Sequence, residues 1–375
     1  MSVLIKVFDS HDYLNNVIAP LSLDLKKVIF ITHDTIPRKH KEAAITLLGH
    51  KGIDAMIVEL KDDEKEIDSL FRTYPQAIVD ISSDRYLNFY IFERAIREGR
   101  EVIYFDNREN VIKDYRTHTI LKKDLYHLDI AEMIYLAGGT IKTTLHEAPD
   151  MYDKDYVNKV KMIMQHVIDD YGHFTNFISK TMQILKGEIK VSLSKKQKNS
   201  LINSDYYQLF KDLDIVLIQN NTLKIDPRFK TLLTNAGSWL ESYLYITIKE
   251  SGDFDDCIMS ATIDFSDRDD IYPVICEIDA IVALANRLAF ISCKSNRVST
   301  EALNEIKVHR HVFGSETSKA VIFTAEDLNI KNPPIFKKAQ ELSVAVIDKT
   351  TIENRSIALV MKKILSDTYR YERVS

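Results

Sequence analysis

The first 150 residues alternate short apolar runs with stretches of amphipathic helical pattern. The predicted strands are VLIKVF (3–8), KVIFIT (27–32), DAMIVEL (54–60), QAIVDIS (76–82) and EVIYFD (101–106). The intervening stretches, such as RKHKEAAITLLGH and DRYLNFYIFERAIREG, are predicted to be helical. Strands that are apolar on both faces and separated by helices indicate a parallel sheet with both faces covered. This part of the chain is therefore expected to be Rossmann-like.

The pattern changes after residue 150. Residues 153–235 begin with one long helix or a helical pair and continue with helix, helix and a small hairpin turning at Asn220-Asn221, an order that resembles a winged-helix unit. From Gly237 onward, helices again alternate with apolar strands, which predicts a second α/β unit. We therefore expect an α/β protein divided into a Rossmann-like unit (1–150), a helical or winged-helix unit (151–235) and a second α/β unit (236–375).

Polar residues follow the predicted strands of the first unit. No G-x-G-x-x-G sequence follows any of these strands, so the dinucleotide-binding fingerprint is absent. In open α/β sheets ligands bind outside the carboxyl ends of the strands. The candidate ligand residues at these ends are Asp9, Ser10, His11, Thr32, His33, Ser82, Ser83 and Arg85. Serine and aspartate at such positions can also simply cap the following helices.

The run CEIDAIVALANRLAFISCKS (276–295) reads as two strands joined by a tight turn. A two-residue turn at Asn286-Arg287 would place Asp279 directly opposite Lys294. The side chains that would then share one face of the hairpin are Glu277, Asp279, Ser292 and Lys294. An exposed cross-strand Asp–Lys pair would contribute only about 0.2–1 kcal/mol and needs no function.

The apolar surroundings of this pair favour a second interpretation. The flanking strands are otherwise apolar, and a buried ion pair is costly unless further ligands satisfy it. A divalent cation would supply that compensation, because hard cations prefer carboxylate and carbonyl oxygens. Asp279 and the main-chain carbonyl of Cys293 could provide two of them.

Composition limits the classes of function. The 45% hydrophobic and 28% charged fractions are typical of a folded soluble protein, and a formal net charge of −5 excludes a general polycation. The three cysteines are too few for a disulfide framework, which favours a reducing cytosol. An early acidic residue argues against a signal peptide, and no apolar stretch approaches the ~20 residues of a membrane span. We expect a cytoplasmic protein with no membrane partner.

The hairpin resembles the core of the PD-(D/E)xK restriction-endonuclease-like fold. In that family a glutamate on the preceding helix completes the metal site, and Glu241 in GSWLE stands at that position. The resemblance implies a nuclease with Glu241, Asp279, Ser292 and Lys294 as catalytic residues and Mn²⁺ or Mg²⁺ as cofactor. One departure is Ser292, which occupies the place of an acid in ISCK and is a poorer metal ligand. Glu277, on the same strand face as Asp279, could compensate.

The whole chain resembles the CRISPR-associated ancillary nucleases of type III systems, in which an N-terminal CARF domain precedes a restriction-endonuclease-like domain. The resemblance implies a homodimer that binds a cyclic oligoadenylate, typically cyclic tetra-adenylate, through the polar loops named above. Binding would activate cleavage of single-stranded DNA and RNA. A second departure lies after the fourth strand, where DISSDRY replaces the family's Thr-Gly-Gly-Thr-like turn.

Two other functions remain open. The chain could be a non-catalytic CARF regulator in which the winged unit binds DNA and the C-terminal unit is vestigial. It could also be a stand-alone restriction or repair nuclease whose first half senses no ligand. The lysine cluster on the winged unit, Lys195, Lys196 and Lys198, is predicted to be a solvated charged face rather than a phosphate site.

Overall fold

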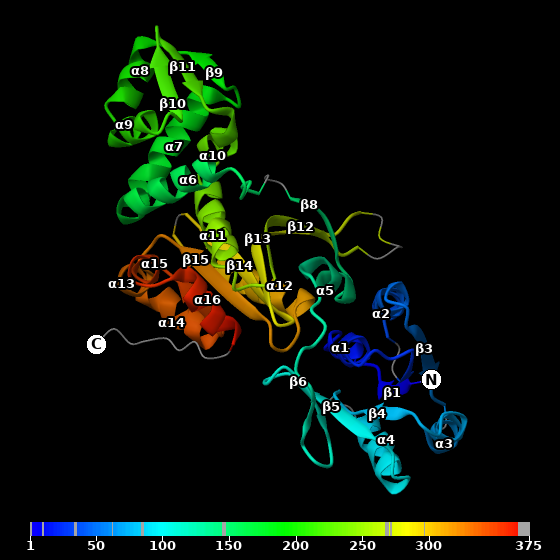
Figure 1. The fold of residues 1–375 in the computed structure, drawn as a ribbon. Helices are drawn as coiled ribbons and strands as arrows, with labels where there is room; N and C mark the ends of the chain where they lie inside the picture. Colours follow the sequence, from blue (N-terminus) through cyan, green and yellow to red (C-terminus); the bar gives the residue numbers. More distant parts are fainter. Residues whose placement is uncertain are drawn as a thin grey trace.

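The computed structural model describes residues 2–9, 11–33, 36–61, 63–83, 86–144, 148–266, 270, 272–295 and 297–366. Three units lie along an elongated molecule, with the N-terminal sheet at one end, the C-terminal sheet in the centre and the largely helical middle segment at the other end (Figure 1). The chain therefore runs past the central unit to the far end before it returns to complete that unit.

The N-terminal sheet has seven strands in the order β3-β2-β1-β4-β5-β6-β7. Its parallel part contains β1 (Val3–Val7), β2 (Lys27–Thr32), β3 (Asp54–Glu59), β4 (Ile78–Asp80) and β5 (Val102–Asp106). The connecting helices are α1 (Asn15–Ser22), α2 (Arg38–His50), α3 (Asp63–Thr73) and α4 (Tyr86–Arg97). The predicted parallel sheet is confirmed. The sequence reading missed the antiparallel strands β6 (Val111–Asp114) and β7 (Ile120–Lys122), which extend one edge.

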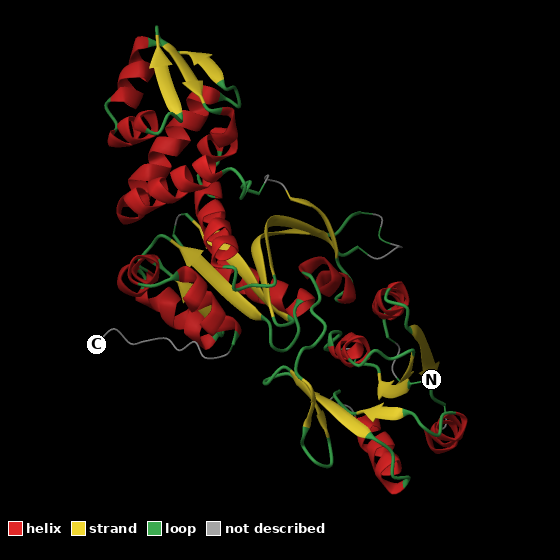
Figure 2. Cartoon of the chain, in the orientation of Figure 1, coloured by secondary structure: helices red, strands yellow, loops and turns green. Residues whose placement is uncertain are grey.

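The middle segment has the element order of a winged helix, and Figure 2 shows it to be largely helical with one small sheet at its far end. Its helices are α6 (Lys154–Val167), α7 (Tyr171–Leu185), α8 (Lys195–Ile202), α9 (Asp205–Asp212) and α10 (Lys230–Thr234), with 3₁₀ turns η1 (Ile168–Asp170) and η2 (Pro227–Phe229). Its strands β9 (Lys190–Ser192), β10 (Val216–Gln219) and β11 (Thr222–Ile225) form a sheet in the order β10-β11-β9. Asn220 and Asn221 have φ of 49° and 59°, so the hairpin turns where the sequence predicts.

The central unit contains a mixed six-stranded sheet in the order β16-β15-β14-β13-β12-β8. Its strands are β12 (Asp256–Asp264), β13 (Ile275–Leu284), β14 (Arg287–Lys294), β15 (Lys319–Thr324) and β16 (Val344–Ile347). Its helices are α11 (Ser238–Ser251), α12 (Thr300–Phe313), α13 (Leu328–Lys331), α14 (Pro333–Glu341), α15 (Lys349–Asn354) and α16 (Ile357–Leu365). Helix α11 ends at Gly252, which takes the left-handed conformation that glycine adopts at low cost. Helix α12 begins after Ser299, whose side chain accepts a hydrogen bond from the Ala302 N–H group.

The sixth strand of the central sheet comes from a segment that precedes the middle unit. Strand β8 (Thr140–Thr144), which follows helix α5 (Ile130–Leu136), pairs antiparallel with β12. The sequence reading did not predict this strand, because it precedes its partner by more than a hundred residues. The division at 150 and 235 stays a prediction, but the central sheet draws one strand from residues before the first division.

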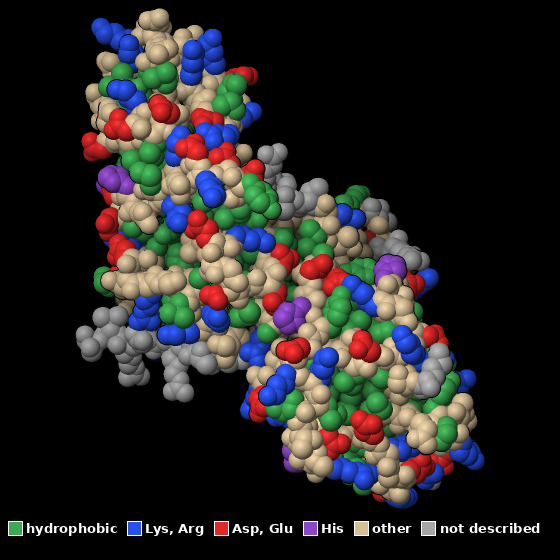
Figure 3. Space-filling view, in the orientation of Figure 1, with side chains coloured by type: hydrophobic (Ala, Val, Ile, Leu, Met, Phe, Trp, Pro, Cys, Tyr) green, Lys and Arg blue, Asp and Glu red, His purple; other side chains and the backbone are tan. Residues whose placement is uncertain are grey.

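The first and central units also share one apolar core. A single cluster of buried side chains includes Leu14 and Met133 from the first part of the chain together with Phe290 and Phe313 from the central unit. Contacts of this kind hold two units more firmly than a polar interface does. Acidic and basic side chains are interspersed over the face in Figure 3, as the small net charge leads one to expect. Among the described residues, no helix is both long enough and apolar enough to span a bilayer.

The turn of the β13–β14 hairpin differs from the prediction. Leu284 pairs with Arg287, so the two turn residues are Ala285 and Asn286, both with positive φ (51° and 59°). The predicted turn at Asn286-Arg287 is wrong by one residue, and the predicted Asp279–Lys294 pairing is wrong by two. Because side chains alternate along a strand, a shift of two keeps the same residues on the same face.

Contacts outside the hairpin explain this choice of turn. The Asn286 side chain accepts from the Leu128 N–H group and donates to the Tyr126 carbonyl. The Arg287 guanidinium donates to three main-chain carbonyls, those of Asn107, Arg108 and Leu365. These bonds require Asn286 at the tip and Arg287 on the strand, and they outweigh the unfavourable left-handed conformation of Ala285.

Replacing Ala285 with glycine is expected to stabilise the protein by roughly 0.5–1 kcal/mol, because glycine adopts the left-handed φ without steric cost. The measurement is the thermal unfolding midpoint, which should rise by a few degrees at most. Ala283→Gly, at a buried position within β13, is the control and should lower the midpoint. A lower midpoint for Ala285→Gly as well would contradict the strain assigned to the turn.

A buried ion pair lies beneath the carboxyl ends of the N-terminal strands. The Lys6 ammonium on β1 donates to Asp80 Oδ2 on β4 at 2.6 Å, and both side chains are fully buried. Lys6 also donates to the Asn15 carbonyl, and Asp80 Oδ1 accepts from the Ser82 N–H group at 2.8 Å. These additional bonds satisfy both charges, as a buried pair requires.

Candidate functional site

A polar pocket of about 140 Å³ lies between the β13–β14 hairpin and helix α12. The polar side chains that line it are Glu277, Asp279, Ser292, Lys294, Glu305 and His309. The hairpin thus brings together on one face the four residues that the sequence predicts to share it. Their catalytic and metal-binding roles remain predictions.

Asp279 is the centre of the hydrogen bonds in this pocket. Its Oδ2 atom accepts from the Cys293 N–H group at 2.7 Å and from Ser292 Oγ at 3.2 Å. The Lys294 ammonium lies 3.9 Å from the same oxygen, within ion-pair range but too far for a hydrogen bond. Both side chains are partly exposed, at 25% for Asp279 and 32% for Lys294. The pair is therefore accessible to a ligand and is not a sealed structural contact.

Glu241 lies on α11, behind the hairpin, and it is buried. One carboxylate oxygen accepts from Ser260 Oγ at 2.7 Å. Burial, followed by the nearby charges of Asp279 and Glu277, raises the pKa of Glu241 to about 7, although the Ser260 hydrogen bond opposes the shift. Ser260 itself has φ of 49°, an uncommon conformation for a non-glycine residue in the middle of a strand.

The negative charges of Asp279 and Glu277 thus act on Glu241, and a bound cation would offset this repulsion. Glu241 and Asp279 offer the carboxylate oxygens that hard divalent cations prefer, and the Cys293 carbonyl and Glu277 could add further ligands. Within the described part of the chain, no group of three or more His, Cys, Asp or Glu side chains is close enough to form a complete metal cage. An ion held here would therefore need ligands beyond these side chains, such as main-chain carbonyls or water.

Helix α12 contributes two pocket residues that the sequence reading missed. Glu305 and His309 are four positions apart, so they lie on the same face of the helix and face the pocket together. Burial lowers the pKa of His309, partly opposed by the negative charges of Glu305 and Asp279. The signal available in the sequence was the Glu-x-x-x-His spacing in TEALNEIKVHRHVF, directly after the lysine-bearing strand.

Replacing Ser292 with aspartate is expected to raise the affinity for Mn²⁺ by about tenfold or more, because cation affinity rises with the number of charged ligands. Titration of the protein with Mn²⁺, followed by electron paramagnetic resonance of the free ion, measures this. Ser299→Asp is the matched control, since it adds the same charge at the α12 cap, where aspartate also caps well. Equal affinities for all three proteins would argue against a cation site beside Ser292.

The predicted ligand residues of the first unit flank the point where the strand order reverses, between β1 and β4. Several of them already form structural hydrogen bonds. The Asp9 carboxylate accepts from the main-chain N–H groups of His11 and Asp12. Ser82 Oγ accepts from the Phe105 N–H group, and Ser83 Oγ accepts from the Asn88 side chain. None of these bonds caps a helix: Asp9 holds its own loop, Ser82 bonds to strand β5 and Ser83 bonds to a side chain.

The other candidates differ in position. His11 is exposed and lines a larger cavity between the first and central units. Thr32 is buried at the end of β2, and the adjacent His33 ring contacts the Leu60 carbonyl through Nδ1 at 3.3 Å. Ser10 and Arg85 lie outside the described residues. As a group, the strand-end residues therefore remain a predicted ligand face.

The buried Asp12 side chain, which lies between β1 and α1, is expected to make the stability of the protein depend on pH. It is buried, and burial together with the nearby Asp9 and Glu316 raises its pKa to about 7 from 3.8. The folded protein thus keeps a proton that the unfolded chain releases, so this contribution to stability is complete below pH 4 and is lost as the pH rises through 7. Asp12→Asn should therefore reduce the loss of stability between pH 5 and pH 8, measured by urea unfolding. The titration of Glu241 contributes equally to both proteins and cancels when they are compared. An unchanged pH dependence in the Asp12→Asn variant would contradict the role assigned to Asp12.

Comparison with protein-family models gives no match, and comparison with curated proteins gives none either. Solved structures do match over nearly the whole chain. Protein VC1899 from Vibrio cholerae has a TM-score of 0.79 and 14% identity, covering 97% of this chain and 98% of that one. Can2 from Sulfobacillus thermosulfidooxidans, in complex with cyclic tetra-adenylate, has a TM-score of 0.74 and 13% identity, covering 97% of this chain and 99% of that one. This chain therefore has the α/β fold of these two proteins from its first sheet to its last.

Proposed function

We propose that this protein is a metal-dependent endonuclease that cleaves single-stranded DNA or RNA once a cyclic oligoadenylate has bound to it. We further propose that it acts as a homodimer in the cytoplasm, as part of type III CRISPR antiviral defence. The observation that carries the proposal is the polar pocket lined by Asp279 and Lys294, whose charges both act on the buried Glu241 behind the hairpin. The full-length similarity in fold to Can2, which was solved with cyclic tetra-adenylate, supports the proposed activator.

Glu241 and Asp279 are the residues we assign to hold Mn²⁺ or Mg²⁺, together with the Cys293 main-chain carbonyl and Glu277. When bound, such an ion polarises the scissile phosphate and lowers the pKa of a water molecule. The partly exposed Lys294 ammonium is suited to stabilise the negative charge that develops on the phosphate. Ser292 holds Asp279 in place through its hydroxyl, which is a positioning role rather than a ligand role.

The central experiment follows cleavage of end-labelled single-stranded DNA and RNA in Mn²⁺, with and without cyclic tetra-adenylate. The expected result is cleavage that depends on both the ion and the cyclic nucleotide. Cleavage at full rate without the nucleotide would replace this proposal with a stand-alone nuclease. No cleavage under any of these conditions, together with binding of cyclic tetra-adenylate, would replace it with a non-catalytic regulator.

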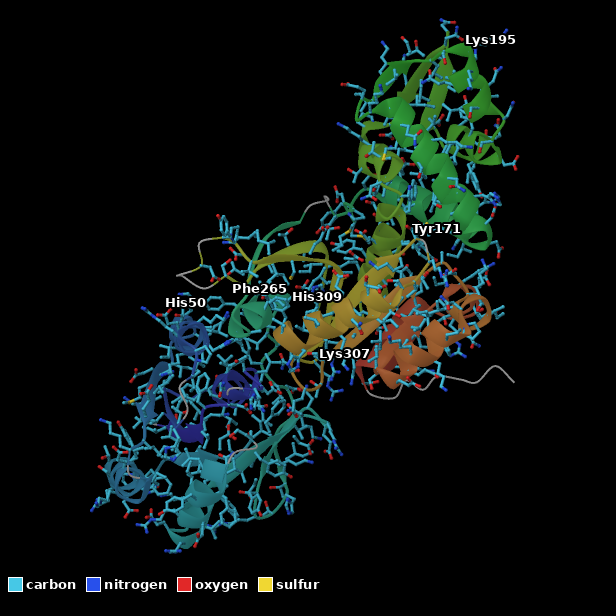
Figure 4. The ribbon with its side chains drawn as sticks, turned by 180° about the vertical axis from the view of Figure 1, so that it is seen from behind. His50, Tyr171, Lys195, Phe265, Lys307 and His309 are labelled. Carbon is cyan, nitrogen blue, oxygen red and sulfur yellow. The ribbon has the colours of Figure 1, made fainter. Side chains whose placement is uncertain are left out.

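The regulator has one observation in its favour, which is the serine in place of an acid at position 292. The winged segment weakens the DNA-binding part of that alternative. In winged-helix proteins the third helix enters the major groove of DNA. The corresponding α9 begins at Asp205 and ends at Asp212, and these carboxylates would repel the phosphates. Lys195 on α8 lies at the far end of the molecule (Figure 4). Lys195 and Lys196 are exposed, as predicted for a solvated face, whereas Lys198 is partly buried and donates to the Asn221 side chain.

A further inference from the structure

The largest cavity described above lies between the first and central units, away from the polar pocket. It has a volume of about 610 Å³, within the range of roughly 300–1,000 Å³ that small-molecule sites occupy. One wall comes from the loop after β1 and from the start of α2, and the other from α12 and the loop that follows it. Cavities between units are preferred positions for ligands.

The charge of the lining is predominantly positive. Lys39 on α2 faces the cavity from the first unit, and Lys307 and Arg310 on α12 face it from the central unit. Glu316 is the acidic side chain of the lining. The Arg310 guanidinium donates hydrogen bonds to the main-chain carbonyls of Ser318 and Glu316, and these bonds fix the position of its charge. A preorganised set of lysine and arginine side chains in a concave site is suited to bind phosphate groups.

Flat rings lie beside these cations. The Tyr13 and His40 rings stack with centroids 3.9 Å apart and an interplanar angle of 10°, and Phe265 lines the same cavity. Gly138 makes room for this arrangement, because a Cβ atom there would lie 2.9 Å from the His40 ring. Aromatic rings next to phosphate-binding cations suit a nucleotide, whose base can stack while its phosphates meet the charges.

Helix α12 connects this cavity to the polar pocket. At about 100° per residue, Lys307 lies about 160° around the helix from both Glu305 and His309. The helix therefore turns one face to the cavity and the opposite face to the pocket that contains Asp279 and Lys294. Figure 4 labels Lys307 and His309 on this helix. A displacement of α12 by a ligand in the cavity would move both pocket residues of the helix.

We infer that the cavity between the two units binds a nucleotide through its phosphates, and that α12 transmits its occupancy to the polar pocket. This ligand site shares His11 and the loop after β1 with the strand-end face, but it lies against the central unit. Nucleotide binding in this cavity does not depend on the proposed nuclease activity. An effect of the bound nucleotide on catalysis does rest on that proposed function.

The test uses ADP as the probe and calorimetric titration of the full-length protein. ADP is expected to bind, and Lys307→Glu should weaken binding by about tenfold or more, since it removes a charge-assisted hydrogen bond and adds repulsion. Lys39→Glu, on the opposite wall, should have a similar effect and serves if the first variant folds poorly. Lys337→Glu, an exposed charge reversal on α14 outside the cavity, is the control and should bind as the unchanged protein does. Absence of ADP binding, or cavity variants that bind ADP as tightly as the unchanged protein does, would overturn the site.

Hydrogen exchange tests the role of α12. ADP should slow amide exchange both in α12 and in β14, where Ser292 and Lys294 lie, and Lys307→Glu should abolish both effects. Slower exchange that excludes β14 would overturn transmission to the pocket. Neither measurement involves cleavage, so a protein that binds ADP but cuts no nucleic acid would refute the proposed function and leave this inference intact.

Discussion

Replacing Asp279 or Lys294 with alanine is expected to reduce cleavage of single-stranded nucleic acid on the order of 100-fold or more. Asp279 accepts three polar contacts in the pocket and is a proposed cation ligand, so its loss removes both a ligand and the organiser of the site. Lys294 supplies the positive charge that would meet the developing charge on the phosphate, and removing such a group typically costs two to three orders of magnitude. The measurement is the single-turnover cleavage rate in Mn²⁺ with cyclic tetra-adenylate.

Asp264→Asn is the control for this experiment. Asp264 lies on the neighbouring strand β12, is outside the pocket and forms an ion pair with the exposed Lys142. Its replacement should leave the rate within about twofold, because exposed pairs contribute little. Cleavage that survives alanine at Asp279 and at Lys294 would move the active site elsewhere in the molecule.

Replacing Asp80 with asparagine is expected to destabilise the first unit by about 3–5 kcal/mol, because it leaves the Lys6 ammonium buried without a counter-charge. Asparagine keeps the size of the side chain and can still accept from Ser82. Native-state hydrogen exchange in β1 and β4 measures the loss in this unit separately from the others.

Two further variants test whether the loss of stability comes from the burial of the Lys6–Asp80 pair. Asp54→Asn breaks the exposed Lys27–Asp54 pair in the same sheet, where the two side chains are 21% and 64% exposed, and should cost less than about 1 kcal/mol. Lys6→Met combined with Asp80→Asn removes both charges and should recover most of the loss. A small effect of Asp80→Asn alone, equal to that of the exposed pair, would show that Lys6 finds other compensation.

The sequence predicts most strands and the hairpin residues of the polar pocket, and local chemistry explains why. The parallel strands are continuous apolar runs, and the Asn220-Asn221 turn contains two residues that tolerate positive φ. Glu277, Asp279, Ser292 and Lys294 share one strand face by alternation alone. These four residues share a face despite the wrong turn, because the error shifted the strand register by two residues and side chains alternate with a period of two.

Features that depend on distant contacts were missed. Nothing near Ala285 shows that Arg287 will reach three carbonyls elsewhere in the chain, so local turn preference gave the wrong tip. Lys6 appears as a lone charge in an apolar strand until Asp80 is placed beside it. His309 and Glu305 belong to an ordinary amphipathic helix, and only the packing of that helix against the hairpin brings them to the pocket.

The contribution of β8 to the central sheet determines how this protein can be divided. A fragment that starts at residue 236, where the sequence suggests a boundary, would lack β8 and leave the long strand β12 as an unpaired edge. Exposed edges of this kind template pairing with other chains. Such a fragment is expected to aggregate, and the C-terminal unit would have to be expressed together with residues 128–144 to remain soluble.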